Sequence, residues 1–191
     1  MANVFATHSV SNSLMTYLRN AYPETLRTPH PFDFRVMSSG EFAEGPEPRN
    51  TLTLLLFRIT HNEHLRARTT ALDAPAANPP LAIDLHYLLT VWADNALLEQ
   101  TIISWAMREM QMHPVLDSSA LSSEADWAPA DVVQLIPAEM GNEELARLWG
   151  VLQPKYRLSV SYIARVIRID ADTTGTRPVV ATRLGVNGAA A

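Results

Sequence analysis

The stretch LAIDLHYLLTVWADNALLEQ, residues 81–100, decides the fold because it joins a strand directly to a helix. Residues 81–93 are mostly branched, aromatic and apolar, a composition typical of a sheet strand. Asp94 or Asn95 can then cap a helix over residues 95–113. The apolar residues of that helix fall close to one face: Leu98, Ile102, Trp105 and Met110. This segment therefore predicts a buried strand followed by an amphipathic helix.

The remaining strands are predicted on both sides of this segment. Residues 32–38 alternate apolar and polar side chains, as in a strand buried on one face. Residues 51–63 contain a run, 54–57, that is apolar on both faces, which is typical of a central strand in a covered sheet. Residues 131–137 and 158–170 predict two more strands. In the last one the alternation changes phase near Tyr162–Ile163, which indicates either a β-bulge or a strand with two apolar faces.

Two further helices are predicted, over residues 9–22 and 141–154. Ser9 or Ser11 can cap the first helix and Asn142 the second. Segments rich in Gly, Pro, Ala and polar residues separate the elements and are predicted to be loops: residues 39–50, 64–80 and 118–130.

This order of elements lacks regular β-α-β alternation. It predicts a single α+β domain over residues 1–170, with a mixed or antiparallel sheet and helices packed on it. Residues 171–191 are rich in Thr, Gly and Ala and are expected to form a C-terminal extension, partly flexible or bound to a partner. Within it, RPVVATRL (residues 177–184) is rich in strand-forming residues and could pair with the sheet edge of a partner.

The composition excludes several classes of protein. Of 191 residues, 47% are hydrophobic and 18% charged, which is enough for a core. The formal charge of −5 argues against a broad surface for nucleic acid or anionic membrane. The absence of cysteine excludes disulfides, thiolate nucleophiles and cysteine-ligated metals. Residues 1–15 do not resemble a signal peptide, and we find no apolar stretch of the roughly 18 residues that a membrane span needs. We therefore expect synthesis and assembly in the cytoplasm.

Polar residues on the strand 81–93 raise the question of chemistry. A metal site would combine His61 and His64 with His86 and Asp84, but the His-x-x-His spacing aligns two imidazoles only on a helix. An acid–base pair would join Asp84 to His86 or Glu99 in a partly dry pocket. Phosphate-loop, nucleophile-elbow and zinc-helix motifs are missing from the sequence. We therefore expect no catalytic residue, metal or cofactor here. We also expect the side chains of Asp84 and His86 to lie on the same face of the strand as Leu88.

Arginines and one tryptophan are the candidate interface residues. Arginines follow or occupy two of the predicted strands and could form a strip for nucleic acid: Arg58, Arg66, Arg68, Arg157, Arg165 and Arg168, with Lys155. Few aromatic residues that could stack on bases accompany them, so contacts with protein are favoured. Trp127 differs from the other tryptophans because it lies in a predicted loop beside prolines and acidic residues, where it could anchor an interface.

Three stretches carry a resemblance to a known family. They are LTLLLFRITHNEHLR, PPLAIDLHYLLTVWADNALLEQTIISWAMREMQMHPVL and LARLWGVLQPKYRLSVSYIARVIRID. Together they resemble the N-terminal domain of cap proteins from phage-tail-like contractile injection systems, of the Photorhabdus-virulence-cassette type. The resemblance runs from about residue 9 to residue 170. It implies a tail-terminator fold without catalytic residues, in which Asp84 and His86 belong to the scaffold.

The resemblance also implies a role in assembly. Such a cap closes the far end of the inner tube and sheath as a six-membered ring, so the expected partners are other copies of the chain, the tube protein and the sheath protein. The protein would become part of the injection particle, without nucleic acid or membrane insertion. Contacts are expected from loops 38–50, 62–80 and 117–130, with Arg66 and Arg68 as charge partners and Trp127 as an apolar anchor. Two alternatives remain. One is a tail-completion protein of a contractile phage, and the other is a soluble small-molecule-binding or enzymatic α+β domain that uses Asp84, His86 and His61.

Overall fold

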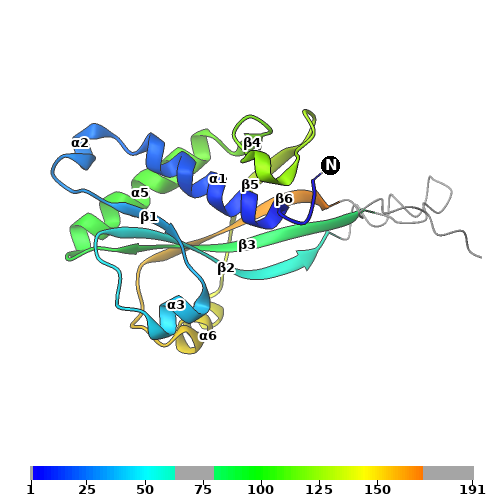
Figure 1. Cartoon of the computed structure of the whole chain (residues 1–191). Helices are drawn as coiled ribbons and strands as arrows, with labels where there is room; N and C mark the ends of the chain where they lie inside the picture. The colour runs from blue at the N-terminus through cyan, green and yellow to red at the C-terminus, as the bar shows by residue number, and fades with distance from the viewer. Residues whose placement is uncertain (1, 63–79, 170–191) are drawn as a thin grey trace, which may run out of the picture.

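The computed structural model describes residues 2–62 and 80–169, and these form a six-stranded sheet with helices on both faces (Figure 1). The strand order is β1-β2-β3-β6-β5-β4. The strands are β1 (Asp33–Val36), β2 (Thr51–His61), β3 (Leu81–Trp92), β4 (Val115–Asp117), β5 (Val132–Ala138) and β6 (Ser159–Ile169). Only β1 and β2 run parallel, and every other neighbouring pair is antiparallel. The α+β prediction with a mixed sheet is confirmed.

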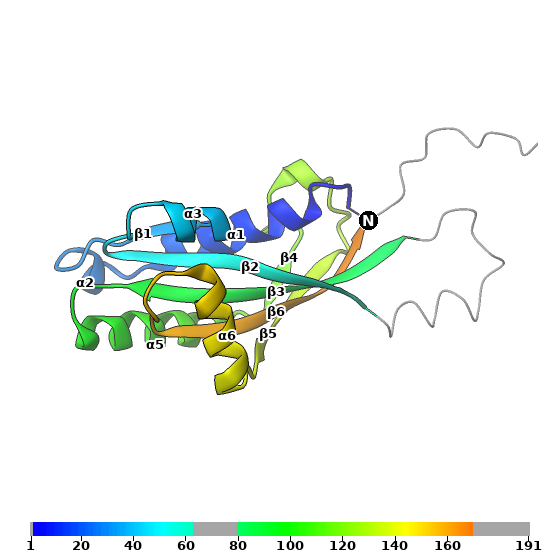
Figure 2. The ribbon, with the colours of Figure 1, turned by 90° about the horizontal axis from the view of Figure 1, so that it is seen from below.

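The two faces of the sheet carry different helices (Figures 1 and 2). Helices α1 (Ala6–Ala21) and α5 (Ala96–Met112) cover one face and enclose the larger core. Helices α3 (Ser39–Glu44) and α6 (Asn142–Leu152) cover part of the other face over a smaller aromatic core. Two short helices, α2 (Glu24–Arg27) and η1 (Ser123–Ala125), lie in connections. Across the described ranges, every helix is too short or too polar to cross a bilayer.

Alternation along β3 assigns its side chains to the two cores. Leu85, Tyr87 and Leu89 enter the larger core, whereas Leu88 and Trp92 enter the smaller one. The predicted run on β2 behaves in the same way, because Leu54 is buried in the larger core and Leu55 in the smaller. Side chains on successive positions of a strand point to opposite faces, so a strand covered on both sides must be apolar throughout.

Helix boundaries depart from the prediction at three places. Helix α1 begins at Ala6, one turn earlier than expected, so Ser9 lies within the helix and is fully buried. Residues 39–50 were expected to be a loop, but α3 forms there. Its start is fixed by a capping box, in which Ser38 Oγ accepts from the Glu41 amide and the Glu41 carboxylate accepts from the Ser38 amide. Helix α6 follows Gly141, and Asn142 provides no cap.

Other local predictions hold. Asn95 caps α5, since its Oδ1 accepts a hydrogen bond of 2.9 Å from the Leu98 amide. The predicted irregularity in β6 is also found, a few residues further on. The register with β3 shifts where Ile83 pairs with Ile167 and Leu85 with Ala164, which leaves one extra residue on β6. The three-residue strand β4 was not predicted.

Candidate functional site

The predicted contact loop 117–130 packs back on helix α1. Trp127 is half-buried against the larger core, and its Nε1 donates to Ser9 Oγ over 2.8 Å. Ser9 Oγ in turn donates to the Ser122 carbonyl, and the Ser122 amide donates to Ser13 Oγ. Buried serines of α1 therefore hold this loop against the helix. This contact was not predicted, because a serine near a helix start is equally typical of a cap.

Asp84 and His86 lie on the same face of β3, as predicted, but each is held by structural contacts. Asn62 Nδ2 donates to both carboxylate oxygens of Asp84, at 3.0 and 3.1 Å, and Arg165 Nε lies 3.7 Å from Oδ2. Nε2 of His86 shares a hydrogen bond of 2.9 Å with the Thr60 hydroxyl. Asp84 thus ties together the ends of β2 and β3 and the neighbouring β6, in keeping with its expected scaffold role.

His61 does not join this pair. It lies opposite Ile83, whose side chain is in the larger core, so His61 belongs to the other face of the sheet from Asp84 and His86. A bulge in β2 between Leu56 and Arg58 sets this register. The three residues of the predicted enzymatic site therefore do not share one pocket.

The environment of His86 disfavours its charged form. Partial burial lowers its pKa below the usual imidazole value, and the guanidinium of Arg58 is the next cause. The carboxylates of Asp84 and Glu144 oppose the shift, and Arg165 adds to it. Above this lowered pKa, His86 is a neutral hydrogen-bonding group. Two arginines and two carboxylates are close enough to influence its pKa.

The face of the sheet that carries α3 and α6 is only half covered by them. Beyond α6 the ribbons of β2, β3 and β6 continue with no described helix in front of them (Figure 2). Residues here point away from the larger core, because their neighbours along each strand enter it. We call this region the open half-face. Its residues include Arg58, Asp84, His86, Val115, Asp117, Val132, Ile136, Ile163, Arg165 and Arg168.

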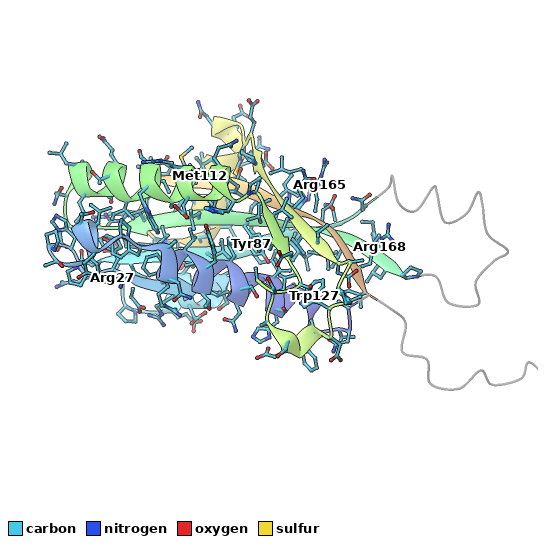
Figure 3. All side chains as sticks on the ribbon, turned by 90° about the horizontal axis from the view of Figure 1, so that it is seen from above. Arg27, Tyr87, Met112, Trp127, Arg165 and Arg168 are labelled. Carbon is cyan, nitrogen blue, oxygen red and sulfur yellow. The ribbon has the colours of Figure 1, made fainter. Side chains whose placement is uncertain are left out.

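Three arginines outnumber two carboxylates, Asp84 and Asp117, and give the open half-face a basic character. Arg58 pairs across the strands with His86, Arg168 with Ala82, and Arg165 lies beside Asp84. All three side chains are exposed. Figure 3 labels Arg165 and Arg168, which both come from β6. Arg165 and Arg168 were predicted as interface residues, and they share this surface. Arg66 and Arg68 lie outside the described residues.

The predicted strip of basic residues is not continuous. Arg157 is engaged inside the molecule, since its guanidinium contacts Glu47 at 3.1 Å and Glu99 at 3.3 Å and lies 5.5 Å from the Trp92 ring centroid. It stabilises the packing of β3 against the segment before β2. Of the described residues in the predicted strip, Arg58, Arg165 and Arg168 lie on the open half-face.

The helices beside the open half-face carry the opposite charge. Helices α3 and α6 contain four carboxylates and one arginine, all exposed: Glu41, Glu44, Glu143, Glu144 and Arg147. Arg147 contacts Glu143 at 3.4 Å in an exposed i,i+4 pair. We call α3 and α6 the acidic layer. One side of the molecule therefore presents an acidic helical layer next to a basic stretch of bare sheet.

Two hollows are found among the described residues. One shallow hollow of about 220 Å³ lies beside β6 and is lined mainly by apolar groups such as Leu88, Leu145 and Tyr162. Another of about 320 Å³ lies by Trp92 and Phe42. Neither contains the sequence-predicted acid–base residues. Within residues 2–62 and 80–169, no three His, Asp or Glu side chains are placed to hold one metal ion.

Two solved structures are similar to this chain. A solved structure described as the sheath/tube terminator of an extracellular contractile injection system, PVC, in its extended state matches 96% of this chain at 16% identity with a TM-score of 0.55. The chain covers 64% of that terminator's length, and this likeness shows a shared fold. The anti-feeding prophage cap, a tube-terminating cap, matches 70% of the chain at 15% identity and a TM-score of 0.43, and 48% of that cap is covered.

No curated protein gives a significant match. A family model, however, matches residues 9–182, which is nearly the whole sequence. This range takes in all six strands and, apart from the first three residues of α1, the helices on both faces of the sheet. The chain belongs to the Pvc16 N-terminal domain family.

Proposed function

We propose that this protein is a structural cap of a contractile injection system, which terminates the inner tube and sheath and joins them at one end as a ring, with six copies as the expected number. The observation that carries the proposal is the family match over residues 9–182. A fold shared with a sheath/tube terminator supports it. The partners would be the tube protein, the sheath protein and further copies of this chain.

The chemistry of the fold suits a scaffold. Strands buried on both faces make a rigid sheet, and rigid sheets with surface loops are suited to repeated protein contacts. Polar groups that could have formed an active site are bonded within the sheet, as with Asp84 and Asn62. The proposed role is accordingly non-enzymatic and needs no cofactor.

The proposed contact residues are those predicted from the sequence. Arg165 and Arg168 would contact partners from the open half-face, Arg66 and Arg68 from the connection between β2 and β3, and Trp127 through its exposed portion. We place the cap function in residues 1–170 and a partner-binding extension in residues 171–191. The protein would assemble in the cytoplasm and end in the particle.

Imaging of particles with and without the gene tests the proposal. We expect uniform particles with a cap density at one end, and in the deletion the loss of that density together with tubes or sheaths of irregular length. Re-expression of the intact chain should restore the cap. Normal capped particles in the deletion would refute the proposal. A DNA-filled head at the capped end would instead indicate a phage tail-completion protein.

A further inference from the structure

The basic open half-face and the acidic layer lie side by side on one molecule, and this arrangement has a consequence for self-association. The acidic layer stands out from the sheet, whereas the sheet beside it is bare of described helices (Figure 2). Such a step is complementary to the same step of another copy, either reciprocally across a two-fold axis or head to tail. In a ring the contact is head to tail, with the layer of one copy on the bare sheet of the next.

We propose that the acidic layer of one copy docks on the open half-face of the next copy, so that this contact repeats around the proposed cap. The inference rests on the proposed function for the closure of the ring, but the contact itself is a property of the chain. In this arrangement, α3 and α6 of a neighbouring copy cover the open half-face.

Charge complementarity is the first argument. The open half-face presents Arg58, Arg165 and Arg168. Its two carboxylates are bonded within the chain, since Asp84 contacts Asn62 and Arg165 and Asp117 accepts from the Ser119 and Ala120 amides. The acidic layer has four carboxylates against one arginine. The chain as a whole carries a charge of −5, so a local basic surface on it is selective for an acidic partner surface. A second copy supplies such a surface.

Apolar exposure is the second argument. Val151 on α6 is 76% exposed, and Val115 and Val132 on the open half-face are 48% and 49% exposed. Interfaces between proteins combine an apolar centre with a charged rim. Both surfaces of the proposed contact have these components: Val151 within the acidic layer, and Ile163, Ile136, Val132 and Val115 on β6, β5 and β4 beside the arginines.

A charge swap tests the contact in the full-length chain. One double variant, Arg58→Glu with Arg168→Glu, reverses the open half-face. The other, Glu44→Lys with Glu143→Lys, reverses the acidic layer. Arg165 is left unchanged because a carboxylate there would face the buried Asp84, and Glu41 is left unchanged because it caps α3. Sedimentation velocity over a range of protein concentrations measures self-association in each case.

We expect the wild-type chain to self-associate and each double variant alone to bind itself at least about 100-fold more weakly, because like charges then face each other. An equimolar mixture of the two should recover affinity to within about tenfold of wild type, since each reversed surface then meets its complement. Raising the salt from low to high concentration should weaken the wild-type contact.

The matched control is Arg49→Glu with Arg108→Glu, which makes the same charge change at exposed arginines outside the open half-face and should sediment as wild type. Circular dichroism checks the fold of every variant, and Arg58→Gln with Arg168→Gln replaces the reversal if that variant unfolds. A monomeric wild type, a double variant that associates normally, or a mixture without recovery would each overturn the proposed contact. Capped particles would still support the proposed function after such a result.

Discussion

The smaller core makes a quantitative prediction about two tryptophans that differ in one hydrogen bond. Trp92 and Trp149 are 1% and 4% exposed, and their rings lie 6.2 Å apart. Trp92 Nε1 donates to Thr53 Oγ1 over 2.9 Å, whereas Trp149 Nε1 is buried with no hydrogen-bond partner among the described residues. Replacement by phenylalanine removes the same atoms from both positions, so the difference isolates the indole N–H.

The magnitudes follow from these contacts. Shortening a buried indole to a phenyl ring costs about 2 kcal/mol in lost burial, at roughly 0.8 kcal/mol for each CH₂-sized group. For Trp92→Phe the lost hydrogen bond adds about 1 kcal/mol, which gives a total near 3 kcal/mol. For Trp149→Phe the removal of an unpaired buried donor stabilises the folded state by about 1–3 kcal/mol, which offsets the lost burial. The net change in the free energy of unfolding is therefore within about 1 kcal/mol of zero.

Urea denaturation followed by far-UV circular dichroism measures both free energies of unfolding. We expect Trp92→Phe to be less stable than Trp149→Phe by about 2 kcal/mol or more. A double-mutant cycle with Thr53→Val separates the hydrogen bond from the packing. Equal losses at the two positions, or a larger loss for Trp149→Phe, would refute the reasoning.

Three further predictions concern other parts of the fold. Because the pKa of His86 is lowered in the folded chain, the imidazole is protonated at a higher pH in the unfolded chain than in the folded one. The contribution of neutral His86 to stability is therefore complete above the ordinary imidazole pKa of about 6.5 and is lost as the pH falls toward the folded-state pKa. Thermal unfolding between pH 7.5 and 5.5 should therefore show a smaller acid-side loss in His86→Gln than in wild type, and parallel curves would contradict this. Tyr17→Phe should cost about 1–2 kcal/mol, because its hydroxyl donates to the Glu109 carboxylate over 2.7 Å; an unchanged denaturation midpoint would show that the bond adds no stability. Gly150→Ala should stabilise α6 by about 0.5–1 kcal/mol, since a methyl group there meets no other atom within 4 Å; a lower melting temperature would rule this out.

The candidate site depended on information that local sequence patterns do not carry. Asp84 and His86 could be assigned to one face from alternation alone. The position of His61 could not, because the bulge in β2 changes the register between Leu56 and Arg58. Trp127 in a polar loop predicted an exposed anchor, yet the loop folds onto Ser9 and half-buries the ring. Both outcomes depend on residues far apart in the sequence.

The sequence by itself determined the kinds of element and their order, because the period of apolar residues distinguishes a strand buried on both faces from an amphipathic helix. It also contained the Asn95 cap, and the Ser38–Glu41 capping box was readable although its Gly- and Pro-rich surroundings predicted a loop. Only the tertiary structure decided which stretch of the sheet stays bare. Helices α3 and α6 are shorter than the strands they cover, so the arginines of β2 and β6 come together on one exposed face through strand pairing and register.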